Sequence, residues 1–345
     1  ITAVLIIACP CALALSAPFA LGNMLRIFGK HKLFLKNAYV IEDMSKIDTI
    51  IFDKTGTITT NRTNITYEGI PLSKNEKQLI RNVLRESNHP LSRMLYDHLD
   101  KSTNIKVSNF EEIFGKGLKG SVDGIEIQLG SESFIKNKPS NNFQTSIFIK
   151  INSDVKGNYI FVNTYREGVS NLFNELDADY KLGVISGDNE GEKQFLENSL
   201  PGNTTLIFDQ KPEDKLEYIE QLQENNKKVL MMGDGLNDAG ALAQSNVGIA
   251  VSENTNVFSP ACDGIIDASQ LSRFPTFIKL TKGTIKVIKI SFVLSFLYNI
   301  IGMLFAVTGN LSPIVAAILM PISSITIVIY VTLATNYIAR KNIFV

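Results

Sequence analysis

The stretch TIIFDKTGT, residues 49–57, decides how the rest of this 345-residue chain is interpreted. Its first half is rich in β-branched and aromatic residues, which predicts a short buried strand. The acidic residue Asp53 ends the apolar run, and a loop containing Gly56 follows it. Open α/β sheets bind their ligands at the carboxyl ends of their strands. We therefore expect Asp53 to be presented to a ligand at such an end, and not to be buried.

Charge and cysteine content exclude some classes of protein. Lys plus Arg and Asp plus Glu number 34 each, so the overall charge gives no support to a nucleic-acid partner. Three cysteines are too few for a disulfide framework. Cys9 and Cys11 lie in an apolar run, which indicates reduced thiols with a function, whereas Cys262 is expected to be a small buried residue. The chain begins inside a hydrophobic segment with no basic leader, so we interpret it as the carboxyl-terminal part of a longer protein.

The first 25 residues carry no charge and are long enough to cross a bilayer, which takes about 20 residues. Pro10 lies between the two cysteines and predicts a break in this helix, because proline removes a backbone hydrogen bond. Two thiolates beside such a break suit a soft monovalent ion such as Cu(I). The alternative is a kinked helix in which both cysteines are merely small apolar residues.

Two further apolar segments, residues 285–307 and 311–335, predict a membrane hairpin. Lysines flank its beginning and Arg340 and Lys341 follow its end, which predicts that both outer ends are cytoplasmic. Polar side chains inside such spans are candidates for function. Alternatively, they hold the helices together.

The middle of the chain alternates between two patterns. Residues 180–185 and 228–232 predict buried strands, and each is followed by acidic residues, as at Asp53. Carboxylates at neighbouring strand ends can share a Mg²⁺ ion. Residues 59–155 are more polar and predict an inserted domain, in which Pro90 starts a helix and the glycines of residues 115–120 form a turn.

Taken together, these motifs resemble known families. DKTGT after an apolar strand resembles the phosphorylation site of the P-type ATPases. With residues 186–189, Lys215 and the GDGLND of residues 233–238, it resembles the four motifs of the haloacid dehalogenase superfamily. His89 followed by the glycine turn resembles the ATP-binding domain of the heavy-metal subgroup. Cys-Pro-Cys, Tyr-Asn and Met-x-x-Ser-Ser in the three spans resemble its copper branch.

The resemblance implies the fold class and the domain order. The fold would be an α/β haloacid-dehalogenase-like, Rossmann-type phosphorylation domain with an inserted α+β nucleotide-binding domain, flanked by transmembrane α-helices. The expected domains are a Cys-Pro-Cys helix with its lead-in (1–46), the phosphorylation domain (47–60 and 158–270), the inserted nucleotide-binding domain (61–157) and a transmembrane hairpin (271–345).

The resemblance also implies roles for particular residues. The expected catalytic residues are Asp53, Lys215, Thr55 and Asp234, with Asp53 accepting phosphate and Mg²⁺ held by Asp53, Thr55 and Asp234. The expected phosphate-binding residues are Lys54, Thr57, Ser186, Gly187, Asp188, Asn237 and Asp238. The expected nucleotide-binding residues are His89, Gly115 and Gly117. The expected ligands of the transported metal are Cys9, Cys11, Tyr298, Asn299, Met320 and Ser324.

The function implied is ATP-driven movement of a soft heavy-metal ion, Cu(I) foremost, out of the cytoplasm through an aspartyl-phosphate. Its partners would be ATP, the metal ion, the lipid bilayer and an amino-terminal part of the same protein, with no nucleic acid. We expect a multi-pass protein of a bacterial plasma membrane. A TGE loop typical of the actuator domain is missing from the sequence, so we expect nucleotide binding without a complete transport cycle.

Three alternatives stay open. One is a pump for Ag(I) or for a divalent metal. Another is a membrane-tethered phosphatase of the same superfamily, which Thr55 disfavours because phosphatases carry an acid/base Asp at that position. The third is a nucleotide-regulated metal-binding or scaffolding protein. It is favoured by departures from the family pattern at Leu84, Ser131 and Asn163.

Overall fold

The computed structural model describes residues 2–9, 11–101, 103–136, 145–235, 237–253 and 262–343, and of residues 61–63 and 343 it describes the backbone. Pro10, at which the sequence predicts a break, lies outside the described residues. The chain divides into two compact units. Unit 1 comprises Ile1–Ile58, Arg166–Asp188 and Glu197–Val345, and unit 2 comprises Thr59–Tyr165 and Asn189–Leu196.

Unit 1 is built on a seven-stranded sheet in which β1 is antiparallel to its neighbour and the other strands are parallel. The strand that carries Asp53, β2, lies centrally, with β11 on one side and β9 on the other. The chain winds outward from β2 in both directions, which makes the carboxyl end of β2 a topological switch point. In spatial order the strands are β1 (Leu33–Leu35), β13 (Gly264–Asp267), β12 (Val247–Ser252), β11 (Val229–Gly233), β2 (Thr49–Asp53), β9 (Lys181–Ile185) and β10 (Thr205–Ile207).

Helices cover both faces of this sheet, which explains why all five residues of β2 are buried. Ile51 packs in a core with residues of α9 (Pro212–Glu224) and α10 (Ala239–Gln244). The next residue, Phe52, points the other way and stacks on Phe173 of α7 (Val169–Asp177), with ring centroids 4.7 Å apart. The alternation fixes the register of β2.

The remaining short elements of this unit are α3 (Tyr39–Met44), η1 (Lys54–Ile58) and η3 (Ala268–Arg273). The short helix η2 (Glu190–Glu192) belongs to unit 2, and α8 (Lys193–Ser199) spans both units.

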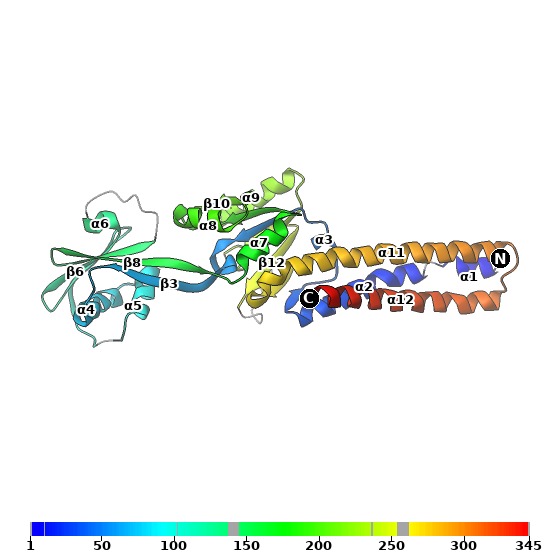
Figure 1. Ribbon diagram of the computed structural model, residues 1–345, viewed down its shortest axis with the longest axis horizontal. Coiled ribbons are helices and arrows are strands. Elements are labelled where there is room, and N and C mark those ends of the chain that lie inside the picture. Colours follow the sequence, from blue (N-terminus) through cyan, green and yellow to red (C-terminus); the bar gives the residue numbers. More distant parts are fainter. Residues whose placement is uncertain are drawn as a thin grey trace. The chain divides into compact units, whose positions relative to one another are not determined.

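Among the described residues, three stretches of helix are long and apolar enough to cross a membrane. The first consists of α1 (Thr2–Ile7) and α2 (Cys11–Lys30), the second is α11 (Phe274–Val307) with its lead-in, and the third is α12 (Pro313–Ile343). Figure 1 shows these helices running side by side, and each packs against the others. With 34 residues, α11 is about 50 Å long, which exceeds the hydrocarbon thickness of about 30 Å. α11 also contacts α3, α7 and η3. Near its beginning, Phe277 meets Phe28 of α2 edge to face.

Unit 2 is a six-stranded antiparallel sheet covered by α4 (Lys74–Arg85) and α5 (Pro90–His98). As expected, Pro90 is the first residue of its helix, and the glycine turn joins two strands. In spatial order the strands are β3 (Thr59–Gly69), β8 (Asp154–Tyr165), β7 (Ser146–Ile151), β6 (Ile125–Gly130), β5 (Gly117–Val122) and β4 (Val107–Ile113), with the short helix α6 (Glu132–Lys136) after β6.

The chain passes from one unit to the other at residues that differ from the expected domain boundaries. The sequence placed the return to the phosphorylation domain at residue 158, and the α/β pattern was expected to resume there. Instead β8 continues as the antiparallel partner of β3 up to Tyr165, which pairs with Thr59. The return occurs at Arg166.

Candidate active site

Asp53 lies in a buried cluster of charges at the end of β2. The Lys215 ammonium, in the first turns of α9, donates to Oδ1 of Asp53 over 2.5 Å and to Oδ1 of Asp238 over 2.7 Å. Asp53, Lys215 and Asp238 are 3 %, 6 % and 2 % exposed. Buried charges are tolerated when they are paired, and here one cation serves two carboxylates. The three groups together therefore keep a net negative charge.

This surrounding changes the acidity of the two central groups. Burial raises the pKa of Asp53 to about 7; the charge of Asp238 adds to this effect, and Lys215 opposes it. Burial alone would lower the pKa of Lys215, but the carboxylates of Asp53 and Asp238 outweigh it and raise that pKa. Lys215 stays a cation, whereas the negative charge of Asp53 is costly near neutral pH. A cation or an electrophile that meets this carboxylate relieves that cost.

The burial of Asp53 corrects the expectation that it would be presented and not buried. Its place at the strand end is as expected, but Lys215 and the loop after the strand cover it. Gly233, in the neighbouring strand β11, lets Asp238 approach as well. A Cβ at Gly233 would lie 2.7 Å from Oδ2 of Asp238.

The loop after Asp53, η1, reaches the end of β9. The buried Lys54 ammonium pairs with Oδ2 of Asp188 at 2.8 Å, and Oγ1 of Thr55 donates to the same oxygen over 3.1 Å. The backbone N–H of Asp188 donates to Oγ of the buried Ser186 over 3.0 Å, and Gly187 between them is exposed. Residues from two strand ends, 133 positions apart, thus converge on one carboxylate.

Thr57 offers an unused hydrogen-bonding group. Its Oγ1 is buried and has no hydrogen-bond partner among the described residues. Such a group is costly unless a ligand or water satisfies it. Oδ2 of Asp238 is likewise buried without a hydrogen-bond partner among the described residues. These two oxygens mark the interior of the site as polar and available.

Arg166 anchors the loop from the other side. Its Nε donates to the carbonyl of Thr57 over 2.8 Å and its Nη2 to the carbonyl of Gly56 over 2.9 Å, while Nη1 pairs with Glu253 at 2.9 Å. The guanidinium fork suits such planar multiple contacts. The sequence carries no sign of this role, because the partner carbonyls are 109 and 110 positions away and belong to the backbone.

Asp234 follows β11, next to β2 in the sheet. Asn237 holds its carboxylate, since the backbone N–H donates to Oδ1 over 3.1 Å and Nδ2 to Oδ2 over 3.0 Å. Its charge also helps to raise the pKa of Asp53, which shows that the two carboxyl groups are near each other. The described residues hold no ready cluster of three His, Cys, Asp or Glu side chains. Mg²⁺ needs none, since it binds one or two carboxylates and completes its shell with water and substrate. The oxygens present fit that ion.

The residues expected to bind nucleotide lie in unit 2. His89 is the N-cap of α5, and its Nδ1 accepts from the backbone N–H of Leu91 over 3.3 Å. Gly115 and Gly117 both have positive φ, 69° and 155°. At Gly117 a Cβ would lie 2.2 Å from the carbonyl oxygen of Leu129 on β6, so the close pairing of β5 with β6 requires glycine there.

In the membrane helices, the structure differs from the expectation of reduced thiols. Cys9 and Cys11 are joined by a disulfide. The cause is local geometry, because the helix is interrupted between α1 and α2 and the two Cα atoms are 5.5 Å apart, within the range that a disulfide can bridge. Cys262 is buried and free, as expected.

The other expected metal ligands lie on α11 and α12. The hydroxyl of Tyr298 donates to the carbonyl of Leu319 over 3.0 Å, directly before Met320. The hydroxyl of Ser324 donates to the carbonyl of Met320 over 3.3 Å. Tyr298 is thus tied to the turn of α12 that carries Met320, and Asn299 follows it on α11, half-buried.

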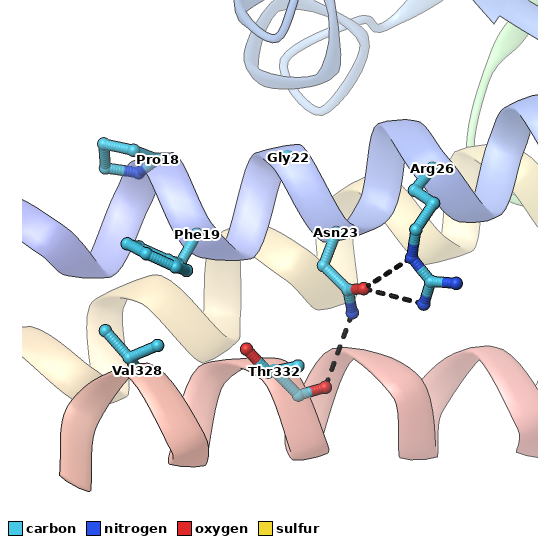
Figure 2. A pocket seen from close by; sticks show the side chains of 7 residues that line it. All are labelled: Pro18, Phe19, Gly22, Asn23, Arg26, Val328 and Thr332. Atoms are coloured by element: carbon cyan, nitrogen blue, oxygen red, sulfur yellow. Dashed lines mark hydrogen bonds between the residues drawn. The ribbon is translucent and has the colours of Figure 1, made fainter. Parts of the chain in front are cut away.

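A groove of about 500 Å³ runs between the second half of α2 and the middle of α12. Figure 2 shows Pro18 and Phe19 at its apolar end and Asn23 and Arg26 at its polar end. Nδ2 of Asn23 crosses to Oγ1 of Thr335 over 2.8 Å, and Arg26 donates to Oδ1 of Asn23. These contacts fix α2 against α12.

Comparisons with known proteins agree with this architecture. A family model described as haloacid dehalogenase-like hydrolase matches residues 47–246. A copper-exporting P-type ATPase of Staphylococcus saprophyticus is 32% identical over 344 residues, which cover 94% of this chain and 43% of that protein. One of Staphylococcus aureus strain JH9 is 30% identical, over 94% of this chain and 42% of that protein. The chain thus spans less than half the length of the curated relatives it matches.

Solved structures show the same fold. A zinc-transporting PIB-type ATPase in the E2.Pi state matches with a TM-score of 0.80 at 22% identity, over 95% of this chain and 56% of that one. The catalytic CPx-ATPase domain CopB-B matches with a TM-score of 0.54 at 27% identity, over 74% of this chain and 97% of that one. The fold class expected from the sequence is confirmed. The chain therefore belongs to the haloacid dehalogenase-like hydrolase family, and its relatives over nearly its whole length are P-type ATPases.

Proposed function

We propose that this chain is the catalytic and metal-binding part of an ATP-driven pump that moves Cu(I) out of the cytoplasm through an aspartyl-phosphate on Asp53. The buried pairing of Asp53 with Lys215 at a topological switch point carries the proposal. The curated relatives named copper-exporting P-type ATPases support the cargo.

In the proposed reaction, Oδ2 of Asp53 is the nucleophile. Oδ1 is held by Lys215, and Oδ2 has no hydrogen-bond partner among the described residues. A bond forms between Oδ2 and the γ-phosphorus of ATP, the bond to the bridging oxygen breaks, and ADP leaves with that electron pair. Lys215 balances charge on the transferred group, and Oγ1 of Thr57 can donate to one of its oxygens.

Mg²⁺ is the cofactor that the oxygens of this site fit. Asp53, Asp234 and the carbonyl of Thr55 would hold it, and it would supply positive charge to the phosphate oxygens. The pocket would be bounded on the side of β9 by Lys54, Ser186, Gly187 and Asp188. Asn237 orients Asp234. Thr55 donates to Asp188 and has no ionisable group, so it cannot act as the acid that would hydrolyse the phosphoenzyme quickly.

ATP would bind unit 2 through His89 and the glycine hairpin of Gly115 and Gly117. This part is supported by the structure of the catalytic domain CopB-B that describes its conformational changes upon nucleotide binding. It matches with a TM-score of 0.53 at 26% identity.

For transport, Cys9 and Cys11 would bind the ion once the disulfide is reduced to two thiolates, with Tyr298, Asn299, Met320 and Ser324 nearby. Sulfur ligands select Cu(I) over hard ions. An amino-terminal part of the same protein would supply the actuator domain and further helices. The protein would reside, as a multi-pass protein, in a bacterial plasma membrane, in keeping with the Staphylococcus relatives.

Phosphorylation tests the catalytic half. The detergent-solubilised chain is incubated with Mg²⁺ and ATP radiolabelled at the γ-phosphate. We expect acid-stable, hydroxylamine-labile label, which Asp53→Asn abolishes. Asp209→Asn, at an exposed carboxylate after the edge strand β10, is the matched control and keeps the label. Label that persists in Asp53→Asn, or no label in the parent chain, contradicts the proposal.

Copper binding tests the membrane half. After reduction, the chain should bind Cu(I) in competition with a chromogenic chelator. The double variant Cys9→Ser, Cys11→Ser should lose that binding, and Cys262→Ser should keep it. Equal binding by the double variant, or a preference for Zn²⁺, would assign another site or another metal.

A further inference from the structure

A carboxylate covers one edge of β8 close to the point where the chain leaves unit 2. Along this edge β7 pairs with β8 up to Ile160, and the backbone N–H of Phe161 donates to the carbonyl of Thr145 over 2.9 Å. The backbone N–H of Asn163, two residues later, donates instead to Oε1 of Glu192 over 3.2 Å. Glu192 therefore takes the place that a neighbouring strand holds earlier along β8.

The second oxygen of the same carboxylate accepts from two side chains. Oε2 of Glu192 accepts from Nδ2 of Asn163 over 3.1 Å and from the hydroxyl of Tyr165 over 3.0 Å. The ring of Tyr165 also packs on that of Phe195 in α8, with ring centroids 4.8 Å apart. Hydrogen bonds to an ionised acceptor are stronger than those between neutral groups. We call the contacts of Glu192 with Asn163 and Tyr165 the Glu192 clamp.

Asn163 is the type of residue that this carboxylate requires. An asparagine amide supplies two N–H donors, whereas an ionised aspartate can only accept hydrogen bonds. Aspartate at position 163 would place two negative charges against each other, which is unfavourable. The departure from the family pattern at Asn163 is therefore matched by Glu192, whose carboxylate needs a donor as its partner.

The two chain segments that meet in the Glu192 clamp both lead to η1, the loop after Asp53. Arg166 directly follows Tyr165 on the first segment. Its side chain donates to the carbonyls of Gly56 and Thr57, and its backbone N–H donates to the carbonyl of Ile58 over 2.9 Å.

The second segment reaches the loop through Asp188, which precedes η2. Oδ2 of Asp188 pairs with the Lys54 ammonium and accepts from Oγ1 of Thr55. Each of the five residues of η1 is thus held by Arg166 or by Asp188, and these two residues lie on the two segments that the clamp joins.

We propose that Glu192 is a positioning residue for phosphoryl transfer to Asp53, an inference that rests on the proposed function. It acts through Arg166 and Asp188, because the clamp joins the segments that carry them. The loop η1 then stays in the arrangement in which Thr57 can donate to the transferred group. Without the clamp the two segments move independently, and the loop spends less time in that arrangement.

The test places a second charge in the clamp and then removes the first one. In the whole chain in detergent, Asn163→Asp should lower the rate of Asp53 labelling at saturating ATP about tenfold, as expected for losing one hydrogen bond to a charged group. Adding Glu192→Gln should restore the rate, because glutamine can donate to the new carboxylate. The matched control adds Glu190→Gln instead, which removes a carboxylate of the same turn that pairs with Lys193, and should not restore the rate.

Two further readouts separate positioning from a general loss of structure. The Kd for ATP, measured by calorimetry, should be unchanged in Asn163→Asp, because the clamp is not among the contacts proposed for the nucleotide. Labelling from acetyl phosphate, which carries no nucleotide, should slow as much as labelling from ATP. Circular dichroism confirms that each variant is folded.

Three results would overturn the inference. The first is an unchanged rate in Asn163→Asp. The second is a rescue by Glu190→Gln, or none by Glu192→Gln. The third is a slower rate from ATP alone, which would place the effect in nucleotide binding and not in the loop.

Failure of the proposed function has a separate readout. If the parent chain is labelled neither from ATP nor from acetyl phosphate, the proposed function fails. Hydrogen–deuterium exchange then decides the clamp by itself, because it reports local opening without any reaction. The amides of residues 54–58 should exchange faster in Asn163→Asp and return to the parent rate when Glu192→Gln is added. Unchanged exchange in Asn163→Asp means that the clamp does not hold the loop.

Discussion

Two polar sites of unit 1 differ in the kind of side chain that forms them: one consists of charged groups and the other of uncharged groups. At the sheet, Asp53, Lys215 and Asp238 are full charges buried against one another. Among the expected metal ligands on the membrane helices, the polar groups are hydroxyls, the Asn299 amide and sulfur atoms, and the sequence has no charged residue from 290 to 339. Charges at the sheet can be buried because adjacent strand ends and a helix supply the opposite charge at close range.

The membrane site lacks that option. A lone charge at the centre of a bilayer is expensive, and polar groups there find partners mostly in nearby backbone. Ser16 of α2 illustrates this, because its hydroxyl contacts that of Ser291, which also donates to the carbonyl of Ile288 within α11. The sheet site is thus suited to a hard, highly charged reaction and the membrane site to a soft ion of low charge. The largest mutational effects should fall on the sheet site.

Replacing Lys215 by methionine should have the largest effect. It keeps the volume but leaves Asp53 and Asp238 buried without a cation, and removing one partner of a buried ion pair costs about 3–5 kcal/mol. The melting temperature followed by circular dichroism should fall by roughly 10 °C. Lys181→Met, at an exposed position on β9, should leave it nearly unchanged. Equal melting temperatures of the parent chain and Lys215→Met would show that Lys215 does not stabilise the two buried carboxylates.

The sequence predicts those parts of the sheet site that are local patterns, but not the contacts between distant positions. The end of β2, the glycine loop and the acidic ends of the neighbouring strands are local patterns, and each was predicted where it occurs. The pairing of Lys215 with Asp238, the grip of Arg166 on the loop backbone and the burial of Asp53 depend on elements over 20 to 160 positions apart. Spacing along the chain cannot encode such contacts.

The membrane helices and the nucleotide unit show the same limit. Length and apolarity predicted the three spans, and proline and glycine predicted the helix start and the hairpin. The disulfide between Cys9 and Cys11 and the extension of β8 to Tyr165 were not foreseen, because they depend on backbone geometry and strand pairing.

The pH dependence of stability should show an intermediate effect. The ordinary pKa of an aspartate carboxyl is 3.8, and the fold raises that of Asp53 to about 7, so the folded state holds this proton more tightly than the unfolded state. Its contribution is therefore fully present below about pH 4 and is lost as the pH rises through about 7. Without Mg²⁺, this group should lower stability by at most about 1.4 kcal/mol per pH unit across that range.

The measurement is the difference in melting temperature between the parent chain and Asp53→Asn at each pH, which removes the contribution of other titrating groups. The advantage of Asp53→Asn should grow from about pH 4 to 7 and then level off. Asp209→Asn should show no such trend. A difference that shrinks with rising pH would mean that Lys215 outweighs burial and lowers the pKa of Asp53.

The smallest effect should come from the membrane site. Ser16→Ala removes one buried hydroxyl contact, and Ser291 keeps its bond to the carbonyl of Ile288. Polar contacts between membrane helices contribute about 0.6 kcal/mol on average, so the melting temperature should change by no more than about 2 °C. Ser323→Ala, whose hydroxyl bonds within α12, is the control for loss of a serine alone. If Ser16→Ala destabilised the chain as much as Lys215→Met, uncharged groups in the membrane helices would be as tightly coupled as buried charges. The two sites would then differ in the ligands that they bind, but not in how much their polar contacts contribute to stability.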